Sequence, residues 1–406
     1  MKILEVNKFF YPRRGAERHF IDLIRLLEGQ GHEVAVFSME HPENLPSPYA
    51  KFFPPYVGFN SDDSTFFQRL RGITRVWSFG NQKKMESLLT EFCPDVVHIH
   101  NIYHQLSLSI LAPIKKRGIP IVMTVHDYHL VSPDKDYSHE DLHGKWFRFL
   151  LDTHYAFPKR LALLLKFLIE RQFRLYDRFV DAYVVPSTYL AGILDRSGIS
   201  GGKIVTLPHF SSSLSSLSNK NVSAEEYTLP QNMPKQNGYA LCLGAVSEEK
   251  GVNDIARIFD RLEFPLIVAG AKEKNFHPLK SNFVSFVGKK SKSEVRVLIE
   301  NAKLVISGSR LEETFGLVAL EALSYGKPFF GMNVGAYPEI VRQGRDGFLG
   351  KNINDLEYGV RQYLSGELVM DVSEELKQRI KRDFSPTHYG NRILTLFESL
   401  IRRNRP

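Results

Sequence analysis

Short apolar segments alternate with amphipathic helical segments along most of the chain, and this alternation limits the possible folds more than any other feature. Lys2–Val6 is predicted as a strand, a turn follows at 13–15, and the next helix carries Phe20, Leu23 and Leu27 on one face. Further strands are predicted at Glu33–Phe37, Asp95–His100, Ile119–Val125, Ala182–Val185 and Ile204–Leu207. Since alternating strands and helices are typical of parallel sheets covered by helices, we expect an α/β fold.

A polar segment divides this pattern into two halves. Residues Ser211–Gly238 are rich in Ser, Asn and Pro and have no hydrophobic period, which is typical of an interdomain linker. After it, strands are predicted at Tyr239–Leu243, Pro265–Ala269, Val284–Val287 and Lys303–Ser307, and helices at Val252–Arg261, Lys292–Asn301 and Gly316–Tyr325. We therefore predict two doubly wound lobes, 1–210 and 236–384, joined by a linker at 211–235. Because such sheets bind ligands at the carboxyl ends of their strands, we expect the site in a cleft between the lobes.

The composition excludes several classes of protein. The chain has 406 residues, 43% of them apolar and 24% charged, which is typical of globular domains. Its two cysteines, Cys93 and Cys242, cannot form a disulfide framework and are predicted as buried thiols in a reducing compartment. The amino terminus becomes polar too early for a secretory signal, and no apolar run reaches the roughly 20 residues that span a bilayer. We expect a cytoplasmic protein, either soluble or peripheral on the inner face of the membrane.

The most specific motif lies in the second half and runs from Glu313 through Thr-Phe-Gly-Leu-Val-Ala-Leu to Glu321. It follows a predicted strand and enters a predicted helix at Gly316. Glycine lets a backbone come close to a ligand, and the free amides of a helix N-terminus suit a phosphate. One carboxylate would then meet sugar hydroxyls, and the other would meet a ribose. An ordinary helix with acidic ends and a solvated Glu321 explains the same pattern.

Together with other segments, this motif resembles the retaining glycosyltransferases of family four. The resemblance covers nearly the whole chain in order and spacing, and its further segments are the Gly15 turn, His98-Ile-His100, Thr124-Val-His126-Asp127, Val185-Pro-Ser187, Gly244 to Gly251, Gly326-Lys-Pro328, Gly335 to Glu339 and Asp346-Gly-Phe348. It implies the GT-B fold, with two Rossmann-like lobes, an interlobe cleft and a C-terminal crossover helix at 385–406 that returns to the first lobe. It also implies sugar transfer from a nucleotide-diphosphate sugar, such as a UDP- or GDP-sugar.

The resemblance assigns roles to several residues of the second lobe. Glu313 would touch the donor sugar as a catalytic residue, and Glu321 would bind the ribose hydroxyls. The backbone amides of Phe315, Gly316 and Leu317 would line the sugar and the diphosphate.

Lys250 would neutralise the diphosphate, as a metal ion does in other transferases. The family usually has an arginine directly after the glycine that ends the first strand of this lobe, whereas Gly244 is followed here by Ala245. Losing a charge-assisted hydrogen bond to phosphate would cost about 1.5–3 kcal/mol. Either another cation replaces that arginine, with Arg310 and Lys289 as candidates, or the enzyme is slow or inactive.

In the first lobe, the resemblance implies that His126 contacts the donor sugar and the transferred group, and that the loop at Gly15 approaches the diphosphate or the acceptor. A histidine that satisfies loop carbonyls is the alternative for His126.

A metallohydrolase is also conceivable from His98, His100, His104, His126, Asp127 and His129, because His98 and His100 project to the same face of a strand. No further carboxylate-rich motif completes such a site. We therefore predict no metal and no cofactor, with the nucleotide sugar as co-substrate.

A basic and apolar segment at 145–178 holds eight Lys and Arg residues against three acidic ones. Its aromatic, aliphatic and cationic side chains suit a helix in an anionic membrane interface, and a helix packed on its own sheet with a solvated basic face is the alternative. No nucleic-acid-reading motif accompanies this charge, so we predict no nucleic-acid partner.

We therefore predict a retaining, metal-independent transferase that acts on a glycan or lipid-linked acceptor at the membrane surface. A sugar-nucleotide epimerase with the same fold is one alternative. A pseudoenzyme that binds a nucleotide sugar as a scaffold is the other.

Overall fold

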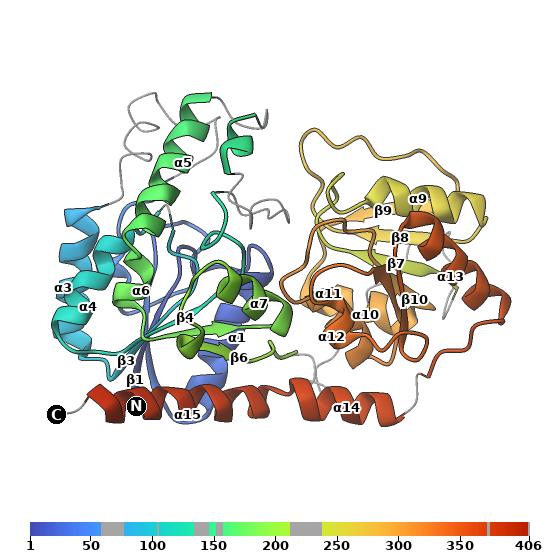
Figure 1. The fold of residues 1–406 in the computed structure, drawn as a ribbon. Coiled ribbons are helices and arrows are strands. Elements are labelled where there is room, and N and C mark those ends of the chain that lie inside the picture. Colours follow the sequence, from blue (N-terminus) through green and yellow to red (C-terminus); the bar gives the residue numbers. More distant parts are fainter. Residues whose placement is uncertain are drawn as a thin grey trace. The chain divides into compact units, whose positions relative to one another are not determined.

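The computed structural model describes residues 1–57, 77–103, 105–133, 146–151, 157–211, 238–371 and 374–404. The chain divides into two compact units: unit 1 contains residues 1–208 and 389–406, and unit 2 contains residues 209–388. Each unit is built on one sheet of six parallel strands (Figure 1). The predicted pair of α/β lobes is therefore confirmed.

The sheet of unit 1 has the strand order β2-β1-β3-β4-β5-β6. Its strands are β1 (Lys2–Val6), β2 (Glu33–Phe37), β3 (Val96–Ile99), β4 (Ile121–Thr124), β5 (Ala182–Val185) and β6 (Ile204–Thr206). The α-helices are α1 (Gly15–Gly29), α3 (Phe79–Phe92), α4 (Leu111–Lys116), α5 (Phe157–Gln172), α6 (Leu175–Phe179), α7 (Thr188–Arg196) and all but the first turn of α15 (Pro386–Asn404).

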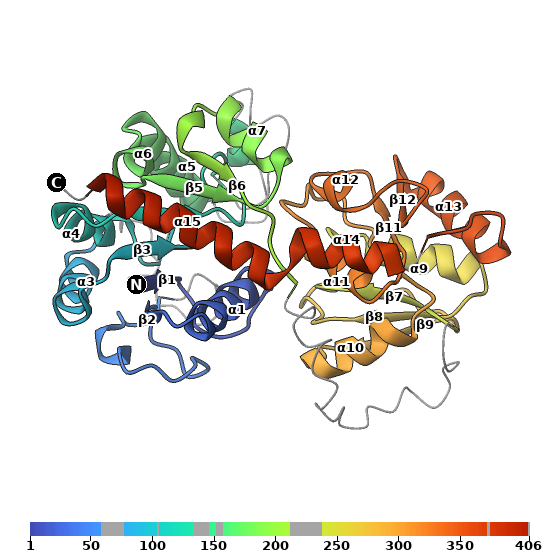
Figure 2. The ribbon, with the colours of Figure 1, turned by 90° about the horizontal axis from the view of Figure 1, so that it is seen from below.

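Helices cover both faces of the sheet in unit 1, and α1 and α15 lie on the same face (Figure 2). On one face, apolar residues of α3, α4 and α7 pack against alternate residues of the strands. On the other face, Phe397 of α15 contacts the ring of His98, with 5.4 Å between the ring centroids. Strands buried on both faces are usually apolar throughout. The face of the sheet that α15 covers departs from that rule, because buried polar residues alternate there with the apolar residues of the opposite face. These polar residues are Glu5, His98 and Thr124.

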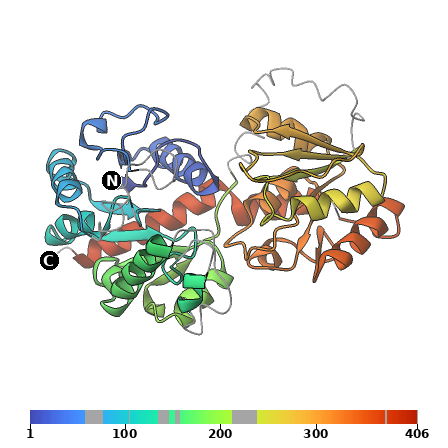
Figure 3. The ribbon, with the colours of Figure 1, turned by 90° about the horizontal axis from the view of Figure 1, so that it is seen from above.

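The sheet of unit 2 has the order β12-β11-β10-β7-β8-β9. Its strands are β7 (Ala240–Leu243), β8 (Leu266–Ala269), β9 (Val284–Gly288), β10 (Leu304–Ile306), β11 (Phe329–Met332) and β12 (Gly347–Gly350). The helices are α9 (Val252–Arg261), α10 (Lys292–Asn301), α11 (Leu317–Ser324), α12 (Tyr337–Ile340), α13 (Ile353–Ser365) and α14 (Glu374–Phe384). Apolar residues of α9 and α13 pack on one face of this sheet, and those of α10, α11 and α14 on the other (Figure 3).

The structure differs from the sequence predictions at two strands and one cysteine. Strands β11 and β12 were not predicted, because glycine interrupts both short apolar runs. The prediction of two buried thiols holds for Cys242 but is wrong for Cys93, which is exposed because it caps the C-terminus of α3 in a left-handed conformation with φ 51°. The predicted linker at 211–235 lies almost wholly outside the described residues. None of the described helices is both long and apolar enough to cross a membrane.

Candidate functional site

The strand order of unit 2 reverses between β7 and β10. From β7 the chain adds β8 and β9 on one side, and it then returns to add β10 on the other side. In open parallel sheets, ligands bind at the carboxyl ends of the strands where the order reverses, because the loops of the two strands diverge there. Lys250 lies in the loop after β7, and Glu313 lies in the loop after β10. The two predicted donor-site residues therefore meet at the point where this fold binds ligands.

Lys250 and Glu313 form an ion pair between these two loops. Lys250 Nζ lies 2.5 Å from Glu313 Oε1, and Ser309 Oγ donates a hydrogen bond to the same oxygen at 3.0 Å. The two side chains keep 31% and 24% of their surfaces exposed, so a ligand can reach both of them. An ammonium group suits a phosphate, and a carboxylate accepts hydrogen bonds from sugar hydroxyls. Ser309 was not predicted as part of the site.

Two glycines bring the loops that carry this pair into backbone contact. Gly251, directly after Lys250, has φ 61°, and a Cβ atom on it would lie 2.1 Å from the carbonyl oxygen of Gly308. A Cβ atom on Gly308 would in turn lie 2.7 Å from the carbonyl oxygen of Gly251. No side chain fits at either position, so this contact fixes the distance between the loops and the position of Lys250.

We expect Gly251→Ala to lower the free energy of unfolding of unit 2 by about 3 kcal/mol, because the left-handed conformation is strained for alanine and the methyl group collides with a carbonyl. Gly366→Ala is the matched control, since Gly366 also has a left-handed φ of 85° but has open space around its Cβ position. That control should lose only about 1 kcal/mol. Urea unfolding followed by circular dichroism measures both variants, and equal losses would contradict this account of the loop contact.

The predicted phosphate-binding backbone lies at the start of α11. Gly316 is the N-cap of this helix with φ 103°, and Leu317 is its first residue. A Cβ atom on Gly316 would lie 2.8 Å from the ring of Tyr337, so only glycine fits. The side chain of Phe315 is buried in the core and contacts the ring of His209, with 5.2 Å between centroids. Phe315 can therefore serve a ligand only through its backbone. Glu321 lies within α11 and is half-buried.

The turn at 335–336 holds the backbone of Glu313. The amide of Ala336 donates a hydrogen bond to the Glu313 carbonyl at 2.9 Å. Gly335 has φ 58°, and a Cβ atom on it would lie 2.3 Å from the same carbonyl oxygen. The segment from Gly335 to Glu339 was part of the family resemblance without an assigned role, and its first two residues position Glu313.

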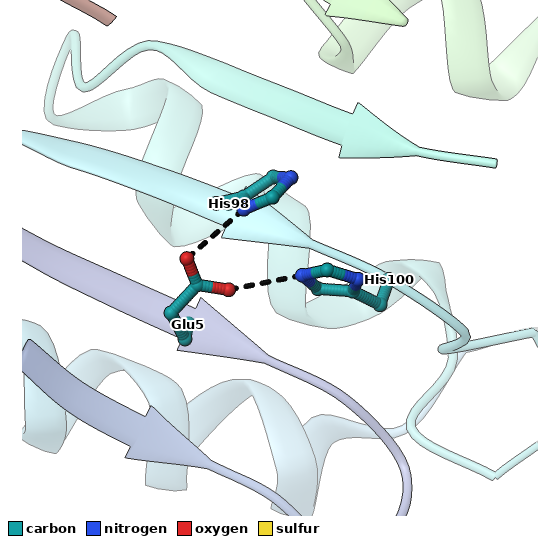
Figure 4. A group of neighbouring side chains, drawn as sticks. All are labelled: Glu5, His98 and His100. Carbon is teal, nitrogen blue, oxygen red and sulfur yellow. Dashed lines mark hydrogen bonds and ion pairs between the residues drawn. The ribbon is translucent and has the colours of Figure 1, made fainter. Parts of the chain in front are cut away.

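In unit 1, His126 ends a chain of buried hydrogen bonds that crosses three neighbouring strands. His100 Nδ1 lies 2.8 Å from His126 Nε2, and His100 Nε2 lies 3.0 Å from Glu5 Oε2. The other oxygen of Glu5 lies 2.9 Å from His98 Nδ1, and His98 Nε2 lies 2.7 Å from Thr124 Oγ1. Figure 4 shows the Glu5 carboxylate between the two imidazole rings. Glu5, His98, His100 and Thr124 have at most 1% of their surface exposed.

Burial keeps the imidazole ring of His126 neutral. Burial lowers the pKa of His126 to about 4 although the Asp127 carboxylate opposes this shift. Burial alone would raise the pKa of Asp127, but the nearby His129 and Lys8 hold it well below its usual range. Burial also lowers the pKa of Lys8, which follows β1 and was not predicted as part of a site. At neutral pH, His126 is therefore an uncharged imidazole beside a carboxylate.

Among the described residues, Glu5, His98 and His100 could also be considered as metal ligands. One potential ligand atom from each lies within 4.8 Å of the others. These atoms already make hydrogen bonds of 2.9–3.0 Å to one another. A metal would need lone pairs on both imidazole nitrogens that face Glu5, whereas these hydrogen bonds need protons there. The arrangement therefore fits a hydrogen-bonded group better than a metal site.

Gly15 and Arg310 were also singled out from the sequence. Gly15 is the first residue of α1, where the amide of Arg14 donates a hydrogen bond to the Glu17 carboxylate at 3.0 Å. Arg310 was predicted as a substitute for the cation missing at Ala245, and its guanidinium donates to the Asp254 carboxylate. Arg310 would have to leave that carboxylate to reach a phosphate.

Comparison with known proteins places both units in one group of enzymes. The family model described as Glycosyltransferase Family 4 matches residues 13–210, and the model described as Glycosyl transferases group 1 matches residues 224–383. An uncharacterized glycosyltransferase of Methanocaldococcus jannaschii is 28% identical over 36% of this chain and 44% of its own length. An uncharacterized 42.6 kDa protein in the cps region of Klebsiella pneumoniae is 24% identical over 88% of this chain and 92% of its own. The match thus spans less than half of the archaeal relative and nearly all of the bacterial one.

Solved structures support the fold. A sucrose-phosphate synthase from Thermosynechococcus elongatus superimposes with a TM-score of 0.68 at 15% identity, covering 99% of both chains. Anabaena HepE in complex with UDP and glucose has a TM-score of 0.62 at 16% identity, covering 98% of this chain and all of its own. Identities this low bear on the fold alone, and the fold agrees with the predicted GT-B architecture.

Proposed function

We propose that this chain, which belongs to glycosyltransferase family 4, transfers a sugar from a nucleotide-diphosphate sugar to an acceptor with retention of the anomeric configuration. The observation that carries the proposal is the ion pair of Lys250 and Glu313 where the strand order of unit 2 reverses. It combines a cation for the diphosphate with a carboxylate for the sugar at the ligand-binding edge of a Rossmann-like sheet.

The donor would replace part of the ion pair with its own groups. Lys250 would turn from Glu313 toward the diphosphate, joined by the backbone amides at Gly316 and Leu317. Glu313 would then accept hydrogen bonds from hydroxyls of the donor sugar, and Glu321 would bind the ribose. A lysine and helix amides that neutralise the leaving diphosphate make a metal ion unnecessary.

Retention follows from the chemistry that we propose for the leaving group. The departing diphosphate would accept the proton of the acceptor hydroxyl, so that attack and departure take place on the same face of the sugar. Glu313 Oε1 already accepts hydrogen bonds from Lys250 and Ser309. A carboxylate held in this way suits the binding of sugar hydroxyls better than nucleophilic attack on carbon. His126 in unit 1 would contact the sugar and the transferred group.

The first test incubates the full chain with UDP-, GDP- and ADP-sugars in the presence of EDTA, with and without a membrane lipid extract as the source of acceptor, and measures the release of nucleotide diphosphate. We place UDP-sugars first because the similar Anabaena HepE was solved with UDP and glucose. We expect release from one donor at a rate that EDTA leaves unchanged. Release that stops with EDTA would contradict the metal-independent mechanism. A new sugar nucleotide without acceptor would indicate an epimerase, and donor binding without release would indicate a pseudoenzyme.

The acceptor proposal rests on α5, which is labelled in Figure 1. Large apolar residues are exposed at every fourth position of this segment, with exposed fractions of 54, 39, 50, 43 and 53% at Phe157, Leu161, Leu165, Ile169 and Phe173. The opposite face is buried through Leu163, Leu164 and Phe167. The helix thus keeps a second apolar face besides the one that packs on its own unit.

Cations lie at the C-terminal end of α5. Arg171 lies in the last turn of α5, and Arg174 and Arg178 are exposed just after it. An amphipathic helix with apolar and basic side chains binds an anionic lipid surface through burial and charge together. We therefore propose that α5 rests on the cytoplasmic face of a membrane and that the acceptor is a glycan or a lipid-linked sugar presented there. The part of the predicted segment at 145 and 152–156 lies outside the described residues.

A further inference from the structure

The hydrogen-bond chain that ends at His126 has one feature that the proposed transfer does not use. Its centre, Glu5, is a carboxylate with no exposed surface on β1, which lies between β2 and β3 in the sheet. A buried charge of this kind is costly unless hydrogen bonds compensate it, and here both oxygens are bound by imidazole rings. An apolar residue at this position would continue the strand at lower cost, so the carboxylate needs a reason.

We propose that Glu5 and His100 are positioning residues that fix the tautomer of His126. This inference rests on the proposed function, in which His126 contacts the donor sugar. An ionised carboxylate can only accept hydrogen bonds, so His100 must carry its proton on Nε2, which faces Glu5. Its Nδ1 then holds a lone pair and accepts from His126 Nε2–H at 2.8 Å. His126 is left with an unprotonated Nδ1, which is a hydrogen-bond acceptor.

Defined tautomers matter because a neutral imidazole is a donor on one nitrogen and an acceptor on the other. The pKa of His126, lowered to about 4 by burial, keeps the ring neutral across the working range of pH. Without the chain, the ring would divide between two tautomers, and only one of them accepts from a sugar hydroxyl at Nδ1. His98 and Thr124 extend the chain on the far side of Glu5 and do not lie between Glu5 and His126.

The direct test measures imidazole tautomers in the full chain labelled with [15N]histidine, using two-bond 1H–15N correlation spectra. His126→Asn identifies the signals of His126. We expect one tautomer in the wild type, with Nε2 protonated and Nδ1 unprotonated. Glu5→Gln should shift both His126 nitrogens toward a mixture, because an amide donates as well as accepts. Thr124→Val is the matched control: it removes a buried hydrogen bond of the same cluster and should leave the His126 tautomer unchanged.

A second measurement separates a positioning role from a structural one. Glu5→Gln should lower kcat of donor turnover about 10- to 100-fold and leave the Kd of the donor nucleotide within about twofold. His100→Asn should retain more activity than His100→Leu, because an amide oxygen near the place of Nδ1 can still accept from His126. Should Glu5→Gln fail to fold, the wild-type spectrum and this pair of variants still decide the question.

Three results would overturn the inference. The first is a His126 protonated on Nδ1 in the wild type, and the second is an unchanged His126 tautomer in Glu5→Gln. The third is a stoichiometric metal in the purified protein that Glu5→Gln loses, since a metal would occupy the nitrogens that face Glu5. The spectra need no substrate, so a failure of every donor to react would overturn the proposed function and leave the tautomer result standing.

Discussion

Replacing Glu313 with glutamine is expected to lower kcat of sugar transfer about 100- to 1000-fold, the size found when one charged or hydrogen-bonding group is removed from a reacting centre. Glutamine keeps the shape of the side chain but cannot form the ion pair with Lys250, and it offers one acceptor oxygen where the carboxylate offers two. The Kd of the nucleotide diphosphate should change little, because the proposed phosphate contacts come from Lys250 and from backbone amides. Steady-state transfer rates and calorimetric titration with the diphosphate measure the two effects separately.

Glu357→Gln is the matched control for this variant. Glu357 is also an ion-paired glutamate of unit 2, with Arg261 and Arg361 as partners, but it lies on α13, away from the reversal of strand order. We expect transfer within about twofold of the wild type, since exposed ion pairs contribute little to stability. Lys250→Ala should raise the Kd of the nucleotide diphosphate, whereas Glu313→Gln should leave this Kd nearly unchanged and lower kcat. If Glu313→Gln transferred sugar at the wild-type rate, the donor site would have to lie elsewhere.

Much of this fold follows from local patterns in the sequence. Strands such as β1 and β5 and helices such as α9 and α10 were predicted with their observed ends, because continuous apolar runs and a 3.6-residue period are local properties. The meeting of Lys250 and Glu313, 63 residues apart, is not local. The family resemblance assigned both residues to one donor but did not predict their ion pair, for which the order of β7 and β10 supplies the physical reason.

The hydrogen-bond chain of unit 1 shows what the sequence could not reveal. His98 and His100 were expected on one face of a strand, but their partner Glu5 lies 93 and 95 residues away. A glutamate within the apolar run of β1 was a signal, since charged residues are seldom fully buried without a partner. The identity of that partner depends on β1 lying beside β3, which no local pattern encodes.

The exposed face of α5 leads to the second large effect. We expect the double variant Leu165→Glu, Ile169→Glu to bind vesicles of anionic lipid at least 100-fold more weakly than the wild type. Burying half of a leucine or isoleucine side chain contributes about 1 kcal/mol, and two added carboxylates would be repelled by the anionic surface. Since both side chains are about half exposed, at 50% and 43%, the variant should keep its fold. Sedimentation with vesicles of anionic and of zwitterionic lipid measures the effect.

Phe79→Glu is the control for adding charge at an exposed apolar position of the same unit. Phe79 begins α3 and is 78% exposed, but no apolar stripe continues from it, because the residue four positions further on is Lys83. We expect it to bind anionic vesicles like the wild type. We expect the wild type to bind zwitterionic vesicles weakly, because such a surface carries no net negative charge to attract the cations at the end of α5. Should the wild type ignore both lipids but form a dimer that the double variant loses, the apolar face of α5 would belong to a contact between two copies of the chain. The Kd of the donor nucleotide should be the same for the double variant and the wild type in either case, since the proposed donor-binding residues Lys250 and Glu313 lie in unit 2.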